Sequence, residues 1–401
     1  MTTTNKKIIR AVTVPQSLGF CREVMIKMRE KGYEMIAVSS PGEQLDELRD
    51  KDGFATYAIP MARHISLFGD IKSLFKMIKV FRKERPQMVH SLTPKAGLIC
   101  MMAAWLTRVP VRVHMFTGLV WPTSKGLKRK ILMATDWLTC ACATHVIPEG
   151  QGVMNDLKNG GITKKPMKVL GYGNVMGVDM NRFDPKRFND TLRYDNDGSL
   201  RQAQGKLSSP QVNENRPFTF VFVGRIVGDK GINELVEAFV KLNEKHPETR
   251  LVLVGRYESE LDPLKPETLQ KIESCKAIDA CGAKYGDDLL MEYLKADCFI
   301  MPSYREGFPN TVMEAGAMGL PSIVTDINGS REIIVDGENG LIVPPQTVQP
   351  LYDAMERMMD DKELRQKMQK NARPMIESRF ERSFVQRCLM EFYDEVLGVK
   401  R

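Results

Sequence analysis

Residues 296–322 constrain the fold more than any other part of the chain. The apolar run at 296–302 predicts a buried strand, and apolar positions between small residues predict a helix from about Asn310. Pro309 lies just ahead of that helix, where its missing N–H costs nothing. The segment therefore predicts a strand, a tight loop and a helix in succession, as in a doubly wound α/β sheet.

The start of this predicted helix suits an anion. The backbone N–H groups of Asn310, Thr311 and Val312 would point outward at the positive end of the helix dipole, an arrangement that binds phosphate. Glu306 precedes the helix and Glu314 lies one turn inside it. Because a phosphate site needs no carboxylates, we expect these two to accept hydrogen bonds from sugar or ribose hydroxyls. Two solvated acids at an ordinary helix start are the alternative.

A second strand-turn-helix segment carries cations. An apolar strand at 220–223 ends at Gly224 and Arg225, and Lys230 follows before a helix predicted at 232–242. The planar guanidinium and the ammonium together suit a diphosphate.

The string from Glu306 to Glu314 resembles the signature of retaining nucleotide-sugar glycosyltransferases of family 4, and the Arg225 segment resembles a second motif of the same family. The resemblance implies an α/β chain with the GT-B fold, two Rossmann-like doubly wound domains facing a central cleft. It implies that Arg225 and Lys230 hold the donor diphosphate, that Glu314 binds the ribose and that Glu306 binds the donor sugar and takes part in catalysis. It also implies donor contacts from Gly19, Gly224, Gly307, Phe308, Pro309, Asn310 and Thr311.

The 401 residues allow two domains of ordinary size. We expect an acceptor-binding domain at 1–180, a polar and mobile linker at 181–216, a nucleotide-sugar-binding domain at 217–380, and a terminal helix at 381–401 that packs back on the first domain. The first βα turn contains one glycine, Gly19, where the family is glycine-rich, which weakens a phosphate role there.

Positive charge is concentrated at the start of the chain. Residues 1–130 carry 23 Lys and Arg against 10 Asp and Glu, whereas the whole chain has a net charge of only +8. A helix predicted at 67–85 has an apolar face formed by Ile71, Leu74, Phe75, Ile78 and Phe81 and a basic face formed by Lys72, Lys76, Lys79, Arg82 and Lys83. Most helices of this kind pack their apolar face on their own sheet. The alternative is that the helix contacts an anionic membrane surface, together with the nearby Arg63, His64 and Phe68.

Several residues of the first domain are candidates for the acceptor side. A basic cluster beside Trp121 suits an anionic headgroup or a diphosphate: Lys125, Lys128, Arg129 and Lys130. Residues 90–97 resemble a segment of bacterial family members that build glycans on lipid carriers, so Lys95 is predicted either to meet the acceptor phosphate or simply to be exposed. Relatives often carry a histidine or an acid where this chain has Thr117. The nearest titratable substitute for a catalytic base is His114, unless strand alternation buries it.

Other features exclude some classes of protein. The eight cysteines lack paired metal spacing and indicate reduced thiols of a cytosolic protein. We find no apolar signal region, no run long enough to span a membrane and no recognised nucleic-acid-binding module. No Asp-x-Asp motif accompanies the predicted site, so we expect a reaction that needs no metal cofactor.

Together these features predict a retaining glycosyltransferase that moves a hexose or N-acetylhexosamine from a nucleotide-diphosphate sugar, UDP-linked, to a lipid-diphosphate-linked saccharide. The setting would be bacterial surface glycan or polysaccharide assembly, on the cytoplasmic face of the cell membrane. Retention without a clear nucleophile favours same-face attack, with the leaving phosphate accepting the acceptor proton. Two alternatives stay open: a GT-B epimerase acting on UDP-N-acetylglucosamine, and a non-catalytic nucleotide-sugar-binding protein.

Overall fold

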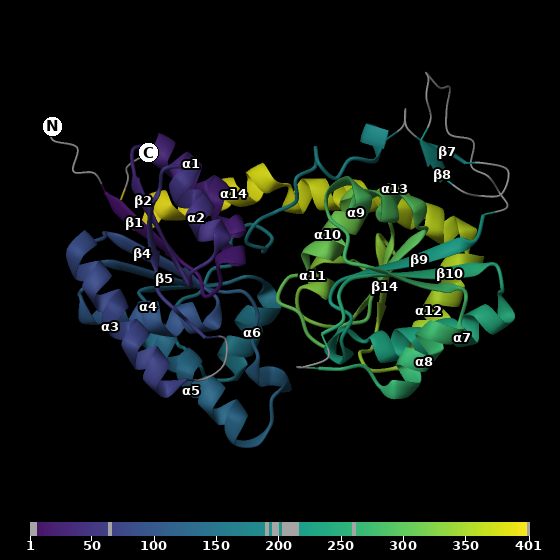
Figure 1. Cartoon of the computed structure of the whole chain (residues 1–401), viewed down its shortest axis with the longest axis horizontal. Helices are drawn as coiled ribbons and strands as arrows, with labels where there is room; N and C mark the ends of the chain where they lie inside the picture. The colour runs from purple at the N-terminus through teal and green to yellow at the C-terminus, as the bar shows by residue number, and fades with distance from the viewer. Residues whose placement is uncertain are drawn as a thin grey trace. The chain divides into compact units, whose positions relative to one another are not determined.

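The computed structural model describes residues 6–62, 66–188, 192–194, 200–202, 216–258 and 262–398. The chain divides into two compact units: unit 1 is residues 1–177 with 382–401, and unit 2 is residues 178–381 (Figure 1). Each unit is built on its own six-stranded parallel sheet.

The sheet of unit 1 has the order β3-β2-β1-β4-β5-β6. Its strands are β1 (Lys7–Ala11), β2 (Glu34–Ser39), β3 (Ala55–Ala58), β4 (Met88–Leu92), β5 (Val111–Phe116) and β6 (His145–Pro148). The 3-10 turns η1 (Pro15–Leu18) and η2 (Trp121–Thr123) lie on its loops. The strand order reverses between β1 and β4, which makes this the switch point of a doubly wound sheet.

Helices cover both faces of the unit 1 sheet. One apolar core packs α1 (Gly19–Glu30), α2 (Glu43–Asp50) and α14 (Arg382–Val396) on one face. A second core packs α3 (Leu67–Glu84), α4 (Pro94–Leu106), α5 (Gly126–Cys142) and α6 (Gln151–Asn159) on the other. Both faces of the sheet are apolar because successive side chains of a strand point to opposite faces. In β1, Ile8 packs into the first core and Ile9 into the second.

Unit 2 repeats the plan, with the order β11-β10-β9-β12-β13-β14. Its strands are β9 (Phe218–Val223), β10 (Thr249–Val254), β11 (Ile278–Gly282), β12 (Cys298–Met301), β13 (Ser322–Thr325) and β14 (Gly340–Val343). One face carries α7 (Ile232–Lys245), α8 (Pro266–Ser274) and α12 (Val348–Asp360). The other carries α9 (Gly286–Lys295), α10 (Asn310–Ala317) and α13 (Lys362–Phe380). Shorter elements are η3 (Pro185–Phe188), η4 (Gly228–Lys230) and α11 (Ser330–Ile333).

The doubly wound α/β architecture predicted from the sequence is confirmed, with three local corrections. The apolar run at 98–106 predicts a helix, whereas α4 begins earlier, at Pro94; the helix α5 was not predicted. The polar stretch 189–216 contains a short antiparallel pair, β7 (Leu192–Tyr194) with β8 (Leu200–Gln202). Arg63 and His64 lie outside the described residues.

Helix α3 also differs from its predicted pattern. Leu74, Ile78 and Phe81 pack into the core as expected, whereas Ile71 is 52% and Phe75 is 67% exposed. The core face of the helix is therefore rotated relative to the predicted apolar face. None of the described helices combines the length and apolar character needed to cross a membrane.

Candidate active site

The cationic motif and the carboxylate motif meet at the switch point of unit 2. Strands β9 and β12 are parallel neighbours, with Cys298 opposite Phe220, and the sheet order reverses between them. Ligands of doubly wound sheets bind outside the carboxyl ends of the strands at such a point. The loops that leave these two strands carry Lys230 and Glu306, and the two side chains form an ion pair. Residues 76 positions apart in the sequence thus lie in contact.

The two loops are also joined by their backbones. Gly231 has a φ of 71°, and a Cβ atom there would lie 2.0 Å from the carbonyl oxygen of Pro302, so this close approach requires glycine. The N–H of Tyr304 donates to the carbonyl oxygen of Asp229 at 2.9 Å, and the Arg305 guanidinium contacts the Asp229 carboxylate at 2.9 Å. The position of Lys230 is therefore fixed by the rigid packing of its loop.

The cations of this site have carboxylate partners. The side chains of Lys230 and Glu306 are only 17% and 14% exposed, so water screens this pair weakly. Arg225, which follows Gly224 at the end of β9, lies 2.8 Å from Glu258 and is 47% exposed. Burial opposes charge on Arg225, but the hydrogen bond to Glu258 raises the pKa of the guanidinium overall.

Helix α10 begins at Asn310 as predicted, with Pro309 at the N-cap position. Pro309 has no side-chain donor or acceptor and so cannot cap the helix itself. Val312 and Met313 are fully buried and anchor the first turn to the core. Thr311 is half-buried at the helix start. The positive end of α10 consequently lies on the loop that carries Glu306.

The remaining predicted donor residues surround this helix. Phe308 is buried and its ring packs edge-on against Phe380. Gly307 is approached closely by Gly329, which has a φ of 75°. A Cβ atom at Gly329 would lie 2.3 Å from the Gly307 carbonyl oxygen, so this contact requires glycine. Glu314 accepts a hydrogen bond from the Tyr293 hydroxyl at 3.2 Å. Burial and the Glu314 charge raise the pKa of Tyr293, so its hydroxyl stays a donor.

The corresponding switch point of unit 1 is closed by hydroxyl groups. Thr93, with a φ of 71°, follows β4, and its Oγ1 lies 2.7 Å from Oγ1 of Thr13, which follows β1. The Thr13 hydroxyl also accepts from the N–H of Ala96 at 3.1 Å. Gly19 is the first residue of α1 and belongs to this unit. The structure therefore does not bring Gly19 together with the other predicted donor residues within one unit.

Two residues of unit 1 that were predicted to act on the acceptor side are not free to do so: His114 is buried, and Lys95 is held in an ion pair. His114 is 1% exposed, and its Nδ1 lies 2.9 Å from Oγ of Ser91. Burial lowers the pKa of His114 to about 3, so the ring is neutral at physiological pH. This position agrees with burial by strand alternation rather than with a base presented to substrate. Lys95 is neither exposed nor unpaired: its ammonium lies 2.5 Å from Asp70, and its side chain is 11% exposed.

The basic cluster near Trp121 divides into an interior and a surface part. Trp121 is 4% exposed and packs against Gly160, so it is not available to a headgroup as predicted. The guanidinium of Arg129 lies 5.6 Å from the centre of the Trp121 ring. The basic residues themselves are exposed around the start of α5: Lys125, Lys128, Arg129 and Lys130.

The ionic partners of Arg225 and Lys95 could not be predicted from the sequence. Glu258 and Asp70 stand 33 and 25 residues from Arg225 and Lys95, and no local pattern connects them. Asp229 did carry a signal, because it directly precedes Lys230 in the same turn.

Comparisons with known proteins show the family of this chain. Residues 205–375 match the family model of glycosyl transferases group 1, and residues 20–173 match that of a glycosyl transferase 4-like domain. A capsular polysaccharide biosynthesis glycosyltransferase of Staphylococcus aureus is 32% identical over 394 residues, which cover 98% of each chain. The chain belongs to the group 1 glycosyltransferases.

Other relatives of this group 1 glycosyltransferase are enzymes of lipid-linked glycan synthesis. A UDP-Gal:alpha-D-GlcNAc-diphosphoundecaprenol alpha-1,3-galactosyltransferase of Escherichia coli is 29% identical over 82% of this chain and 81% of its own. An N,N'-diacetylbacillosaminyl-diphospho-undecaprenol alpha-1,3-N-acetylgalactosaminyltransferase of Campylobacter jejuni is 23% identical over 94% of this chain and 95% of its own.

Solved structures show the same fold. HepE of Anabaena in complex with UDP aligns with a TM-score of 0.74 at 17% identity, over 97% of this chain and 100% of its own. WaaG, a glycosyltransferase involved in lipopolysaccharide biosynthesis, aligns with a TM-score of 0.69 at 14% identity. The alignment covers 98% of this chain and 100% of the WaaG chain. The group 1 glycosyltransferase thus has the GT-B fold expected from its sequence.

Proposed function

We propose that this glycosyltransferase moves a hexose or an N-acetylhexosamine from a UDP-linked sugar to a lipid-diphosphate-linked saccharide, with retention, during bacterial surface polysaccharide assembly. The observation that carries the proposal is the contact of Lys230 with Glu306 at the unit 2 switch point. In this contact, the ammonium that we propose binds the diphosphate lies beside the carboxylate that we propose binds sugar hydroxyls. The names of the E. coli and C. jejuni relatives support a diphospho-undecaprenol acceptor.

The ion pair prepares the site for the donor. An ammonium has three N–H donors, and one of them suffices for Oε1 of Glu306, so the others can reach phosphate oxygens. The carboxylate keeps a second oxygen that can accept from a sugar hydroxyl. Donor binding then adds contacts to the pair without breaking it.

Charge develops on the leaving diphosphate as the sugar becomes oxocarbenium-like. We propose that Lys230, Arg225 and the N-terminus of α10 stabilise that negative charge, which is larger in the transition state than in the bound donor. We propose that these groups take the place of a divalent cation, so the reaction should proceed unchanged in a chelator.

Retention follows from same-face attack in this proposal. The nearest base candidate in unit 1, His114, is buried and neutral. The leaving phosphate oxygen therefore takes the proton of the attacking hydroxyl while the sugar–phosphate bond breaks and the new glycosidic bond forms.

The test is a donor screen with a bacterial lipid extract as acceptor, followed by release of nucleoside diphosphate. We expect release only when both substrates are present, and an α-anomeric product by NMR from an α-linked donor. An inverted anomer contradicts retention. Isomerisation of the donor without acceptor would favour an epimerase, and nucleotide binding without turnover would favour a non-catalytic protein.

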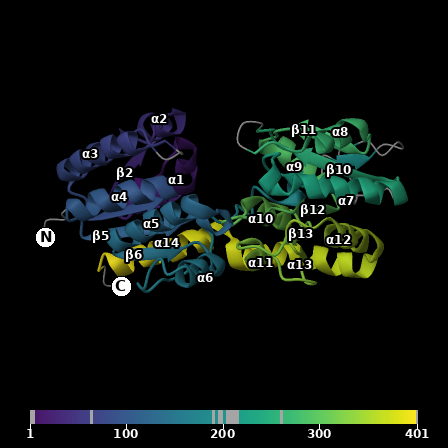
Figure 2. The ribbon, with the colours of Figure 1, turned by 90° about the horizontal axis from the view of Figure 1, so that it is seen from below.

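The acceptor proposal is supported by the outer surface of unit 1. Phe68, Ile71 and Phe75 form one stripe on α3 and are 91%, 52% and 67% exposed. Leu127 and Ile131 form a second stripe on α5 and are 73% and 39% exposed. Helices α3 and α5 both pack against α4 on the same side of the sheet (Figure 2).

Basic residues border both stripes. Lys72, Lys76 and Lys79 are exposed on α3, as are Lys128 and Lys130 on α5. Exposed aromatic and aliphatic side chains among bases are typical of a surface that lies on anionic lipid. We therefore propose that α3 and α5 hold the enzyme peripherally on the cytoplasmic face of the cell membrane.

Flotation with liposomes tests this surface. The enzyme should float with phosphatidylglycerol vesicles at low salt, and Phe68→Ser with Phe75→Ser should abolish flotation. Tyr285→Ser is the matched control, because Tyr285 is 68% exposed on unit 2. Failure of the unmodified enzyme to float, or equal loss in the control, would contradict the membrane proposal while leaving the donor site untouched.

A further inference from the structure

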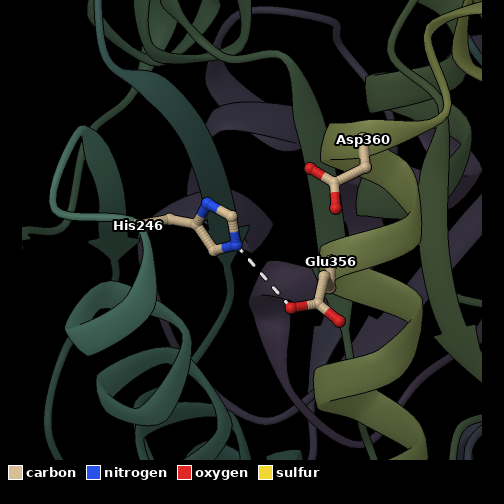
Figure 3. A group of neighbouring side chains, drawn as sticks. All are labelled: His246, Glu356 and Asp360. Atoms are coloured by element: carbon tan, nitrogen blue, oxygen red, sulfur yellow. Dashed lines mark ion pairs between the residues drawn. The ribbon is translucent and has the colours of Figure 1, made fainter.

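A second cluster of ligating side chains lies in unit 2, at the opposite end of α7 from Lys230. His246 directly follows α7, while Glu356 and Asp360 stand one turn apart near the end of α12. Figure 3 shows the imidazole and the two carboxylates directed toward a common space. One ligand atom from each residue lies within 4.8 Å of the others. Because α7 has 14 residues, the cluster is about 20 Å from the Lys230 end.

The spacing fits a single metal ion. Imidazole nitrogen and carboxylate oxygen bind Zn²⁺ at about 2.1 Å, which puts tetrahedral ligand atoms about 3.4 Å apart. Nε2 of His246 lies 3.6 Å from Oε1 of Glu356, close to that value. Small rotations of the Asp360 side chain, which is exposed, would bring the third ligand atom into range.

The histidine is oriented as a ligand. Its Nε2 is buried and has no hydrogen-bond partner within the described part of the chain. Its other nitrogen, Nδ1, lies 3.5 Å from Oε1 of Glu248. A metal ion held by Glu356 and Asp360 would take the Nε2 lone pair, and the Nδ1 proton would then face Glu248, the carboxylate that orients a ligating histidine from its other nitrogen.

Lys245 is the competitor for this site. Its ammonium lies 2.7 Å from Oε1 of Glu356, and the hydroxyl of Tyr352 donates to the same oxygen at 2.6 Å. The Lys245 side chain is 60% exposed, so its ion pair is screened by water and contributes little stability. The ammonium can therefore turn into solvent when a divalent cation takes the carboxylate.

We propose that His246, Glu356 and Asp360 bind a divalent transition-metal ion of the zinc class, which links the end of α7 to the end of α12. The two carboxylates neutralise the ion, and water would complete its coordination. Mixed nitrogen and oxygen ligands select Zn²⁺ over Mg²⁺, which prefers six oxygens. The ion would stabilise unit 2 and take no part in sugar transfer.

Calorimetric titration of the full-length enzyme with Zn²⁺ tests the proposal. We expect one saturable site, no binding of Mg²⁺, and a rise in melting temperature with Zn²⁺. His246→Gln and Asp360→Asn should each weaken Zn²⁺ at least about 10-fold and remove the thermal shift, since each deletes a ligand. Glu237→Gln, an exposed acid on α7 outside the cluster, is the matched control and should bind Zn²⁺ like the unmodified enzyme.

Cobalt identifies the ligands independently, because the chain also contains eight cysteines. The Co²⁺ spectrum should lack a thiolate-to-cobalt charge-transfer band. Such a band, unchanged Zn²⁺ affinity in His246→Gln, or no saturable binding would each overturn the proposal. Transferase activity should be the same in all these variants, so failure here is distinguishable from failure of the proposed reaction.

Discussion

The two units share one strand order but use charge in opposite ways. At the unit 2 switch point, Lys230, Glu306 and Arg225 lie on loops beyond the strand ends. At the unit 1 switch point, the strand ends are joined by the neutral hydroxyls of Thr13 and Thr93. The same topology therefore carries three charged side chains on the loops of unit 2, and in unit 1 a turn joined by hydroxyls, where Lys95 is paired with Asp70.

A fully buried charge of unit 1 lies between its sheet and α14. Arg10 on β1 is fully buried, and its guanidinium contacts the Tyr393 hydroxyl, Nδ1 of His90 at 2.5 Å and Sγ of Cys21 at 3.2 Å. These contacts fix α14 against the sheet. A buried cation with neutral partners stabilises one arrangement of its own chain, whereas cations on loops can exchange partners with a ligand.

The sharpest way to break this comparison is to remove one cation from each unit. Lys230→Ala should lower kcat about 100-fold, if the contact is worth the ~3 kcal/mol of a lost transition-state donor. Lys95→Ala should lower kcat far less and act mainly on stability, because Lys95 is paired with Asp70. Steady-state kinetics with a saturating acceptor measures both.

Lys241→Ala is the control on α7, because that ammonium contacts Gln349 and the Tyr352 ring and no residue of the predicted donor site. A loss in Lys95→Ala equal to that in Lys230→Ala would show that unit 1 also supplies a cation to the reaction, as the acceptor-phosphate prediction for Lys95 requires.

The second prediction concerns the neutral histidines of unit 1. Burial holds the pKa of His90 well below its usual value and lowers that of His114 to about 3. Below pH 6.5 the unfolded chain binds protons that the folded unit does not, so stability falls as pH falls from 6.5 toward about 3. The slope is about 1.4 kcal/mol per pH unit for each histidine.

Tryptophan fluorescence isolates this effect, because all three tryptophans of the chain, Trp105, Trp121 and Trp137, lie in unit 1. Urea unfolding at pH 6.5 and 5.5 should show the loss, and His114→Gln should reduce the difference between the two pH values by about 1 kcal/mol, since an unfolded histidine is only half protonated at pH 6.5. His246→Gln in unit 2 should leave it unchanged. An identical slope in His114→Gln would mean that His114 can be protonated in the folded unit.

The smallest expected effect comes from the partner of Arg225. Glu258→Gln removes the carboxylate that pairs with the Arg225 guanidinium. The side chains of Arg225 and Glu258 are 47% and 38% exposed, so this ion pair is on the surface. Such pairs are worth up to about 1 kcal/mol, so the donor KM should fall by no more than about 5-fold, with kcat unchanged. Donor-dependence curves at fixed acceptor measure this, and a rise in KM would indicate that Glu258 itself contacts the donor.

Sequence patterns were sufficient for the two strand-turn-helix segments of unit 2 that carry the predicted site, because their signals are local. An apolar run ending in Gly224, and Pro309 ahead of small residues, mark a strand end and a helix start regardless of the rest of the fold. The pairing of Lys230 with Glu306 was not readable, since it depends on β9 and β12 being neighbours. The helix α5 was missed because threonines and cysteines interrupt its apolar spacing.

Alternation and periodicity left two orientations undecided. Strand β5 is covered by helices on both faces, so alternation could not decide whether His114 is buried. In α3, apolar residues lie on more than one side, and only packing against α4 shows that Phe75 faces outward.

The most direct test of the central claim is a crystal structure of the enzyme with UDP. We predict that the diphosphate lies at the unit 2 switch point, within hydrogen-bond distance of Lys230 and the first N–H groups of α10, with Glu314 on the ribose. A diphosphate bound away from Lys230 and α10 would contradict the account.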